Sequence, residues 1–207
     1  MSAGEGGPLR VALLYHSYGA SPAAGADLLV HALATALADA GHRPTVLSSH
    51  GGAPSATREG DVRVIRTRRL GEGVLRARGF TGPLTHIPGL LGALSGGGYE
   101  LAHSFSPPDA LAARLWRRGT RRPVVFTCAE ALRREHLADR RLRLRLLAAA
   151  ALESDAVVAA SDAARVGLER WLAVDAPMLA AWDAASHERL YRALLSAPAP
   201  GPARVRG

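Results

Sequence analysis

Short apolar runs alternate with longer segments rich in alanine, leucine and arginine along most of this chain. The runs are rich in β-branched residues or leucine, and several lack a polar face, as interior parallel strands must. Leucines recur at helical spacing in the segments between them. This alternation predicts strands joined by crossover helices, and therefore an α/β fold with a mainly parallel sheet covered by helices on both faces.

Six runs are expected to form strands, with about six or seven strands in the whole sheet. They are Leu9–Tyr15, Pro44–Ser48, Val62–Thr67, Glu100–Ser104, Pro123–Thr127 and Asp155–Ala160.

Five segments are expected to form helices, and two of them begin with a residue that can cap the first turn. They are Ala23–Ala40, Asp109–Arg118, Arg133–Ala151, Asp162–Leu172 and His187–Ser196. Asp109 and Ser161 are the expected N-caps, and Gly41 supplies the left-handed residue that ends the first helix. Gly71–Gly98 holds nine glycines, so it should be a long connection, in which a short helix around Leu90–Leu94 is an option.

The chain of 207 residues has the size of one domain, and no second domain or internal repeat is evident. We expect a single Rossmann-like domain over residues 9–196. Residues 1–8 and 197–207 are rich in glycine, proline and alanine, which predicts a flexible N-terminus and a flexible tail.

Composition excludes several function classes. All 26 basic residues are arginine, which suggests the codon usage of a GC-rich genome and makes the positive charge weak evidence for a nucleic-acid partner. Aromatic residues make up only 5% of the chain, so few side chains can stack on bases, and we expect no nucleic-acid partner. Without lysine there is no Walker A loop and no lysine Schiff base. Cys128 is the single cysteine, so no intrachain disulfide forms, and we expect a buried thiol. No apolar run is long enough to span a bilayer, and no signal peptide is evident, which favours a cytoplasmic location.

A polar, glycine-containing turn follows the first expected strand. It includes His16, Gly19, Gly25 and Asp27. Glycines at the start of a helix let backbone N–H groups approach a polar ligand at the carboxyl end of the sheet. The alternative is that these glycines only shape the turn. No Gly-x-Gly-x-x-Gly follows the strand, so a nicotinamide or flavin cofactor is not expected.

Three motifs in a fixed order resemble the N-terminal domain of family 4 glycosyltransferases, which have the GT-B fold. The segment 24–27, Ala-Gly-Ala-Asp, stands where the family usually reads Gly-Gly-x-Glu, and its helix ends in Gly41-His42 before a strand. Tyr99–His103 is similar to the family's Tyr-Asp-x-x-His, and Ser154–Ser161 to its Ala-Asp-x-x-x-x-x-Ser. The resemblance covers roughly residues 9–172.

This resemblance implies transfer of a sugar from a nucleotide diphosphate to an acceptor hydroxyl, with no further cofactor. This domain would be the acceptor side. The residues expected to bind a sugar or lipid-linked acceptor are His16, Gly19, Gly25, Asp27, His103 and Ser161. His16, His103 and His187 are not at metal-ligand spacing, so no metal is expected.

The chain departs from the family where a histidine usually lies near the reacting sugar, because it reads Thr127-Cys128-Ala129-Glu130 there. His103 and Glu130 are the candidate catalytic residues. The alternative for Glu130 is a solvated carboxylate at a helix entry.

The donor-sugar domain is also expected to be missing, so a separate donor-domain protein would be the partner and the isolated chain would be inactive. The alternative function is a non-catalytic subunit that binds a glycan or lipid-linked acceptor.

Two further segments each allow two interpretations. Trp182–Tyr191 resembles the segment of full-length relatives that returns to pack on the first domain; a generic amphipathic helix is the alternative. Arg133–Arg145 carries six arginines. It is either a peripheral contact with the inner membrane face or a solvated helix face, and the acidic residues Glu135 and Asp139 favour the solvated face.

Overall fold

The computed structural model describes residues 7–19, 25–69, 84–130, 141–181 and 183–197. Its seven strands are β1 (Arg10–Leu14), β2 (Arg43–His50), β3 (Ser55–Glu59), β4 (Val62–Arg68), β5 (Leu101–Ser104), β6 (Val124–Cys128) and β7 (Ala156–Ala159). The helices are α1 (Ala26–Asp39), α3 (Ile87–Gly97), α4 (Pro107–Thr120), α6 (Arg141–Glu153), α7 (Asp162–Leu172) and α8 (Ala184–Ser196).

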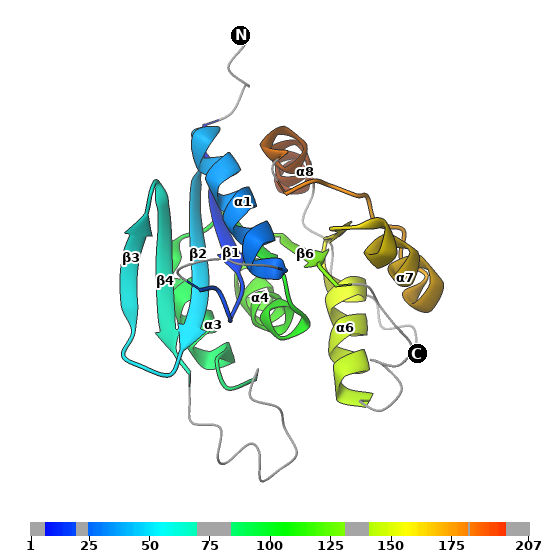
Figure 1. The fold of residues 1–207 in the computed structure, drawn as a ribbon, viewed down its shortest axis with the longest axis horizontal. Helices are drawn as coiled ribbons and strands as arrows, with labels where there is room; N and C mark the ends of the chain where they lie inside the picture. The colour runs from blue at the N-terminus through cyan, green and yellow to red at the C-terminus, as the bar shows by residue number, and fades with distance from the viewer. Residues whose placement is uncertain (1–6, 20–24, 70–83, 131–140, 182, 198–207) are drawn as a thin grey trace.

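The strands form one sheet in the order β3-β4-β2-β1-β5-β6-β7 (Figure 1). All neighbouring pairs are parallel except β3 with β4, which are antiparallel. The predicted α/β fold with a mainly parallel sheet is therefore confirmed. The strand order reverses between β1 and β5, and α/β sheets bind ligands at the carboxyl ends of the strands beside such a reversal.

Helices cover both faces of the sheet. On one face α1 and α8 pack on β1 and its neighbours, and on the other α3 and α4 pack on β1, β2 and β5 (Figure 1). A third cluster joins α6 and α7 to β6 and β7 and includes Cys128, which is buried as predicted. Burial raises the pKa of the Cys128 thiol to about 11, so the thiol stays protonated.

The return of the C-terminal helix onto the domain is confirmed. Tyr191 is fully buried in the same cluster as the α1 leucines, and Leu190 and Leu194 pack against it. The expected turn at the end of α1 is also present, because Gly41 has φ of 84°, a left-handed conformation that favours glycine.

Three local features differ from the elements expected from the sequence. β3 was missed because Ser55–Glu59 is exposed and polar, with no apolar face to mark it. The connection predicted over Gly71–Gly98 contains α3, an eleven-residue helix whose Leu90 and Leu94 are buried and which ends at Gly98. Asp109 is not the N-cap of α4, since Ser106 holds that position and accepts a hydrogen bond from the Asp109 backbone N–H.

Candidate functional site

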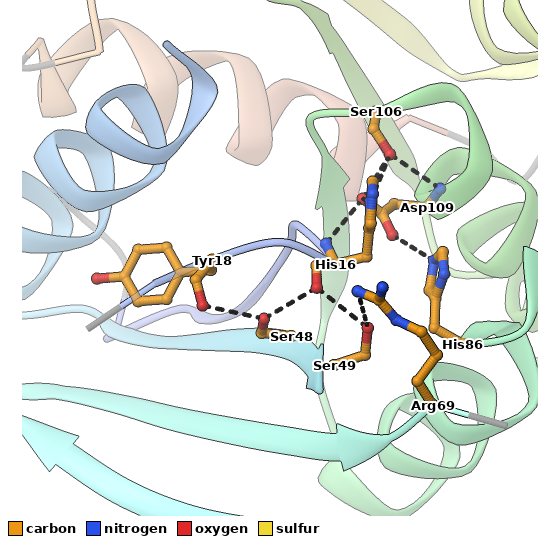
Figure 2. A network of polar contacts seen from close by, with 8 residues as sticks. All are labelled: His16, Tyr18, Ser48, Ser49, Arg69, His86, Ser106 and Asp109. Atoms are coloured by element: carbon orange, nitrogen blue, oxygen red, sulfur yellow. Dashed lines mark hydrogen bonds and ion pairs between the residues drawn. The ribbon is translucent and has the colours of Figure 1, made fainter. Parts of the chain in front are cut away.

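Two adjacent strands deliver polar side chains to the carboxyl edge of the sheet where the strand order reverses. His16 follows β1, and Ser106 and Asp109 follow β5, its hydrogen-bonded neighbour. His86 reaches the same place from the residue before α3 (Figure 2). We call His16, His86, Ser106 and Asp109 the edge cluster.

Asp109 is the centre of the edge cluster and is fully buried. Its Oδ2 accepts hydrogen bonds from the His16 backbone N–H at 3.1 Å, from His16 Nδ1 at 3.1 Å and from the Ser106 hydroxyl at 2.6 Å. Its Oδ1 accepts one from His86 Nε2 at 2.8 Å. Burial alone would raise the pKa of Asp109, but the bonds from His16 and His86 outweigh it and hold that pKa well below its usual range. The carboxyl group is therefore ionised and fixed in place.

The two imidazoles differ in their access to solvent. His86 is fully buried, and burial lowers its pKa despite the hydrogen bond to Asp109. The side chain of His16 is 16% exposed, and its ring stacks on that of His86 with centroids 4.7 Å apart. His16 is thus the member of the edge cluster that a ligand can reach.

The β1–α1 turn is held to β2 by its backbone carbonyls. The Ser48 hydroxyl donates to the carbonyls of His16 and Tyr18, and the Ser49 hydroxyl donates to that of His16 at 3.0 Å (Figure 2). Arg69, just after β4, lies beside this pair, with its guanidinium 3.5 Å from the Ser49 hydroxyl. These contacts fix the position of His16.

Four of the residues expected to bind an acceptor lie between the end of β1 and the first turn of α1: His16, Gly19, Gly25 and Asp27. Gly25 is the N-cap of α1 with φ of 67°, and Asp27 lies in the first turn of that helix. The Gly19 backbone N–H donates to the Asp27 carboxylate, and the charge of His16 acts on the same group. Burial nevertheless raises the pKa of Asp27 above its usual value. Within the described ranges, Asp27 Oδ1 is buried and has no hydrogen-bond partner.

His103 lies in β5, but it is separate from the edge cluster. Its ring is fully buried and is bonded through Nδ1 to the Tyr191 hydroxyl at 2.7 Å and through Nε2 to Thr127 Oγ1 at 2.6 Å. Burial, reinforced by the nearby His187, lowers its pKa well below the usual value. His103 therefore joins the sheet to α8 in this conformation, and its catalytic and acceptor-binding roles stay predictions.

Ser161 and Glu130 follow β7 and β6. The Ser161 hydroxyl caps α7 by accepting from the Ala164 backbone N–H, which confirms the predicted N-cap. β7 is three strand positions from β1, about 14 Å at the usual spacing of ~4.8 Å. Glu130 is exposed, and its charge contributes with Asp27 and Asp109 to a raised pKa of Tyr15, whose largest cause is burial. Glu130 thus lies near the β1–α1 turn, whereas Ser161 lies at the far end of the edge.

Sequence reasoning missed His86 and the role of Asp109. His86 lies in a glycine-rich stretch with no motif around it, so nothing in the sequence signals its place. Asp109 did carry a signal, because Ser106 and Asp109 have the spacing of a capping box, but that pattern predicts a helix start and no more.

Most of the segment Arg133–Arg145 lies outside the described residues, and Trp182 also lies outside them. α6 begins at Arg141, and Leu142 and Leu144 on it are partly exposed. Among the described residues, no helix combines the length and the apolar character that crossing a bilayer requires.

A family model described as "Glycosyl transferase 4-like domain" matches residues 24–181, which is more than half of the chain. The chain belongs to the glycosyl transferase 4-like family. The match includes Gly25, Asp27 and the whole edge cluster except His16. No curated protein sequence matches the chain.

Solved structures of glycosyl transferases share the fold of this family member. Sucrose-phosphate synthase from Thermosynechococcus elongatus superposes with a TM-score of 0.65 at 18% identity, over 82% of this chain and 46% of that one. A shorter form of the same enzyme is covered over 99% of its length, with a TM-score of 0.64, 19% identity and 90% of this chain. Anabaena HepE, in complex with UDP-glucose, gives a TM-score of 0.52 at 18% identity, over 77% of this chain and 40% of that one. The chain thus spans less than half the length of the longer structures.

Proposed function

We propose that this chain is the acceptor-binding domain of a sugar-nucleotide-dependent glycosyltransferase of the hexosyltransferase type. The sugar donor would be a nucleotide diphosphate sugar, bound mainly by a separate donor domain. The acceptor hydroxyl would bind at the carboxyl edge of the sheet, between His16 and Asp27.

The observation that carries this proposal is the unpartnered Oδ1 of Asp27. A buried carboxylate oxygen without a donor costs free energy, and a hydroxyl supplied by a ligand would remove that cost. The atom lies in the first turn of α1, at the strand-order reversal where α/β sheets bind ligands. The Gly19 backbone N–H donates to the same carboxylate, so Asp27 is joined to the turn that carries His16.

The alternative is a non-catalytic subunit that binds a glycan or lipid-linked acceptor. Ala129 favours it, because alanine stands where the family usually has a histidine near the reacting sugar, and a methyl group can neither orient nor polarise a substrate. Both functions use the same acceptor surface. They differ in whether addition of a donor domain restores transfer.

Acceptor binding can be tested by calorimetry with hexoses, hexose 6-phosphates and a short-chain lipid-linked sugar. The Asp27→Asn variant should lose at least about tenfold in affinity, because a hydrogen bond to a charged group contributes about 1.5–3 kcal/mol. Asp39→Asn, at the exposed end of the same helix, is the matched control and should bind as the wild type does. If no probe binds, or if both variants bind equally well, the acceptor site is not at Asp27.

A further inference from the structure

The edge cluster holds two imidazoles and one carboxylate whose donor atoms face one another. One ring nitrogen of His16, one of His86 and one carboxylate oxygen of Asp109 all lie within 4.8 Å of one another. Two imidazoles and a carboxylate are a ligand set that binds Zn²⁺ and related ions. We propose that His16, His86 and Asp109 form a binding site for one divalent transition-metal ion of the zinc type. This inference goes beyond the acceptor-binding function and does not depend on it.

The distances between the ligand atoms are close to those of a metal site. In a tetrahedral zinc site with bonds of about 2.0–2.2 Å, neighbouring ligand atoms lie about 3.3 Å apart. The Asp109 oxygens already lie 3.1 Å from His16 Nδ1 and 2.8 Å from His86 Nε2. The two ring nitrogens must approach one another from at most 4.8 Å, and the rings are nearly parallel, with an interplanar angle of 15°. Because the lone pair of an imidazole nitrogen lies in the plane of its ring, the two rings must tilt toward one another before both nitrogens point at a shared ion.

The charge around Asp109 also favours a cation. Asp109 is fully buried, and the two ion-pair partners found for it are imidazoles, which carry no charge when neutral. Asp27 and Glu130 act on Tyr15 together with Asp109, so three carboxylates lie around this edge. Arg69 opposes a cation, because its positive charge acts on His86. A divalent ion would neutralise Asp109 directly, whereas Arg69 lies further out, beside Ser49.

Metal binding here requires that each ring nitrogen facing Asp109 give up its hydrogen. Each imidazole now directs an N–H at Asp109, and the ion would take the lone pair of that nitrogen once its hydrogen has moved to the other ring nitrogen or to solvent. His86 Nδ1 has no hydrogen-bond partner in the described part of the chain, so no contact there opposes this tautomer. Because His16 is 16% exposed, the fourth ligand would be water from the solvent side.

The test uses the whole chain, treated with a chelator and then titrated with Zn²⁺ by calorimetry and with Co²⁺ by visible absorption. We expect one ion per chain with micromolar or tighter affinity, and the intense visible bands of four-coordinate Co²⁺. His86→Gln and Asp109→Asn should each weaken binding by about 10–100-fold or more, since loss of even a residue that supports a ligand has such an effect. His16→Gln, in the turn, provides a second ligand variant if a buried substitution prevents folding.

Two further variants separate this site from casual binding by histidine. His50→Gln removes a histidine outside the edge cluster and should bind Zn²⁺ as the wild type does. Arg69→Gln removes a positive charge that acts on His86 and should tighten binding several-fold. The proposal is overturned if the wild type binds no ion, or if His16→Gln and His50→Gln bind equally well. Neither result bears on acceptor binding at Asp27, which is measured in the presence of a chelator.

Discussion

His103 is a fully buried residue that joins the sheet to the C-terminal helix. The hydroxyl of Tyr191 on α8 bonds its Nδ1 at 2.7 Å inside the core. Tyr191→Phe keeps the ring but leaves that nitrogen buried and unpaired, so it should lower the free energy of unfolding by about 1–3 kcal/mol. Urea unfolding measures this loss. Tyr15→Phe, where the ring is partly exposed, is the control and should change stability by no more than about 0.5 kcal/mol. Equal stability of Tyr191→Phe and the wild type would show that the His103 contact is not maintained in solution.

At the scale of elements, the contact of α8 with the sheet should depend on pH. Burial is the largest cause that lowers the pKa of His103, which lies under this helix, and of His187, which lies on its buried face. In the unfolded chain their pKa returns to about 6.5, so below that pH the unfolded state binds protons that the folded state does not. The free energy of unfolding should therefore fall as the pH is lowered from 7 to 5, by up to about 1.4 kcal/mol per pH unit for each imidazole.

Urea unfolding at several pH values gives this slope. His187→Gln should make it shallower, whereas His50→Gln, outside this pair, should leave it unchanged. His86 also has a lowered pKa and contributes equally in all three proteins, so the difference between variants isolates the pair between β5 and α8. Parallel curves for His187→Gln and the wild type would rule out this linkage.

The elements themselves were predictable where the chain alternates between apolar runs and long helical segments. The prediction for α7 has the observed bounds, and its capping serine is confirmed, because both depend on local chemistry. β3 and α3 were not predictable in the same way. β3 exists because its backbone pairs with β4, a tertiary contact that leaves no pattern in an exposed polar strand. α3 forms despite several glycines, since Leu90 and Leu94 pack against the sheet.

At the scale of the whole molecule, the sequence indicates where the site is but not which residues compose it. In a parallel sheet the carboxyl ends of the strands lie at the same edge. A polar turn after the first strand was therefore enough to place His16 and Asp27 at that edge. The approach of His86 and Asp109 depends on the order of strands and on the path of the chain into α3 and α4. Spacing along the sequence carries no information on that approach, and His103, which sequence reasoning grouped with His16, lies instead under α8.

Catalytic activity is also a property of the whole molecule. Sugar transfer from a nucleotide diphosphate needs preorganised groups around the leaving diphosphate, in a cleft that excludes water. The described residues form one Rossmann-like unit, and the part of this chain that aligns with the longer solved structures covers 46% or less of each of them. Ala129 also stands where the family usually has a histidine. We therefore expect the purified chain neither to transfer nor to hydrolyse uridine or guanosine diphosphate sugars, and to bind them weakly, while still binding an acceptor. A product-release assay with a panel of these donors, run beside calorimetry, measures both properties. Turnover by the wild type that Glu130→Gln or His103→Gln abolishes, while His50→Gln retains it, would instead make this chain a complete enzyme.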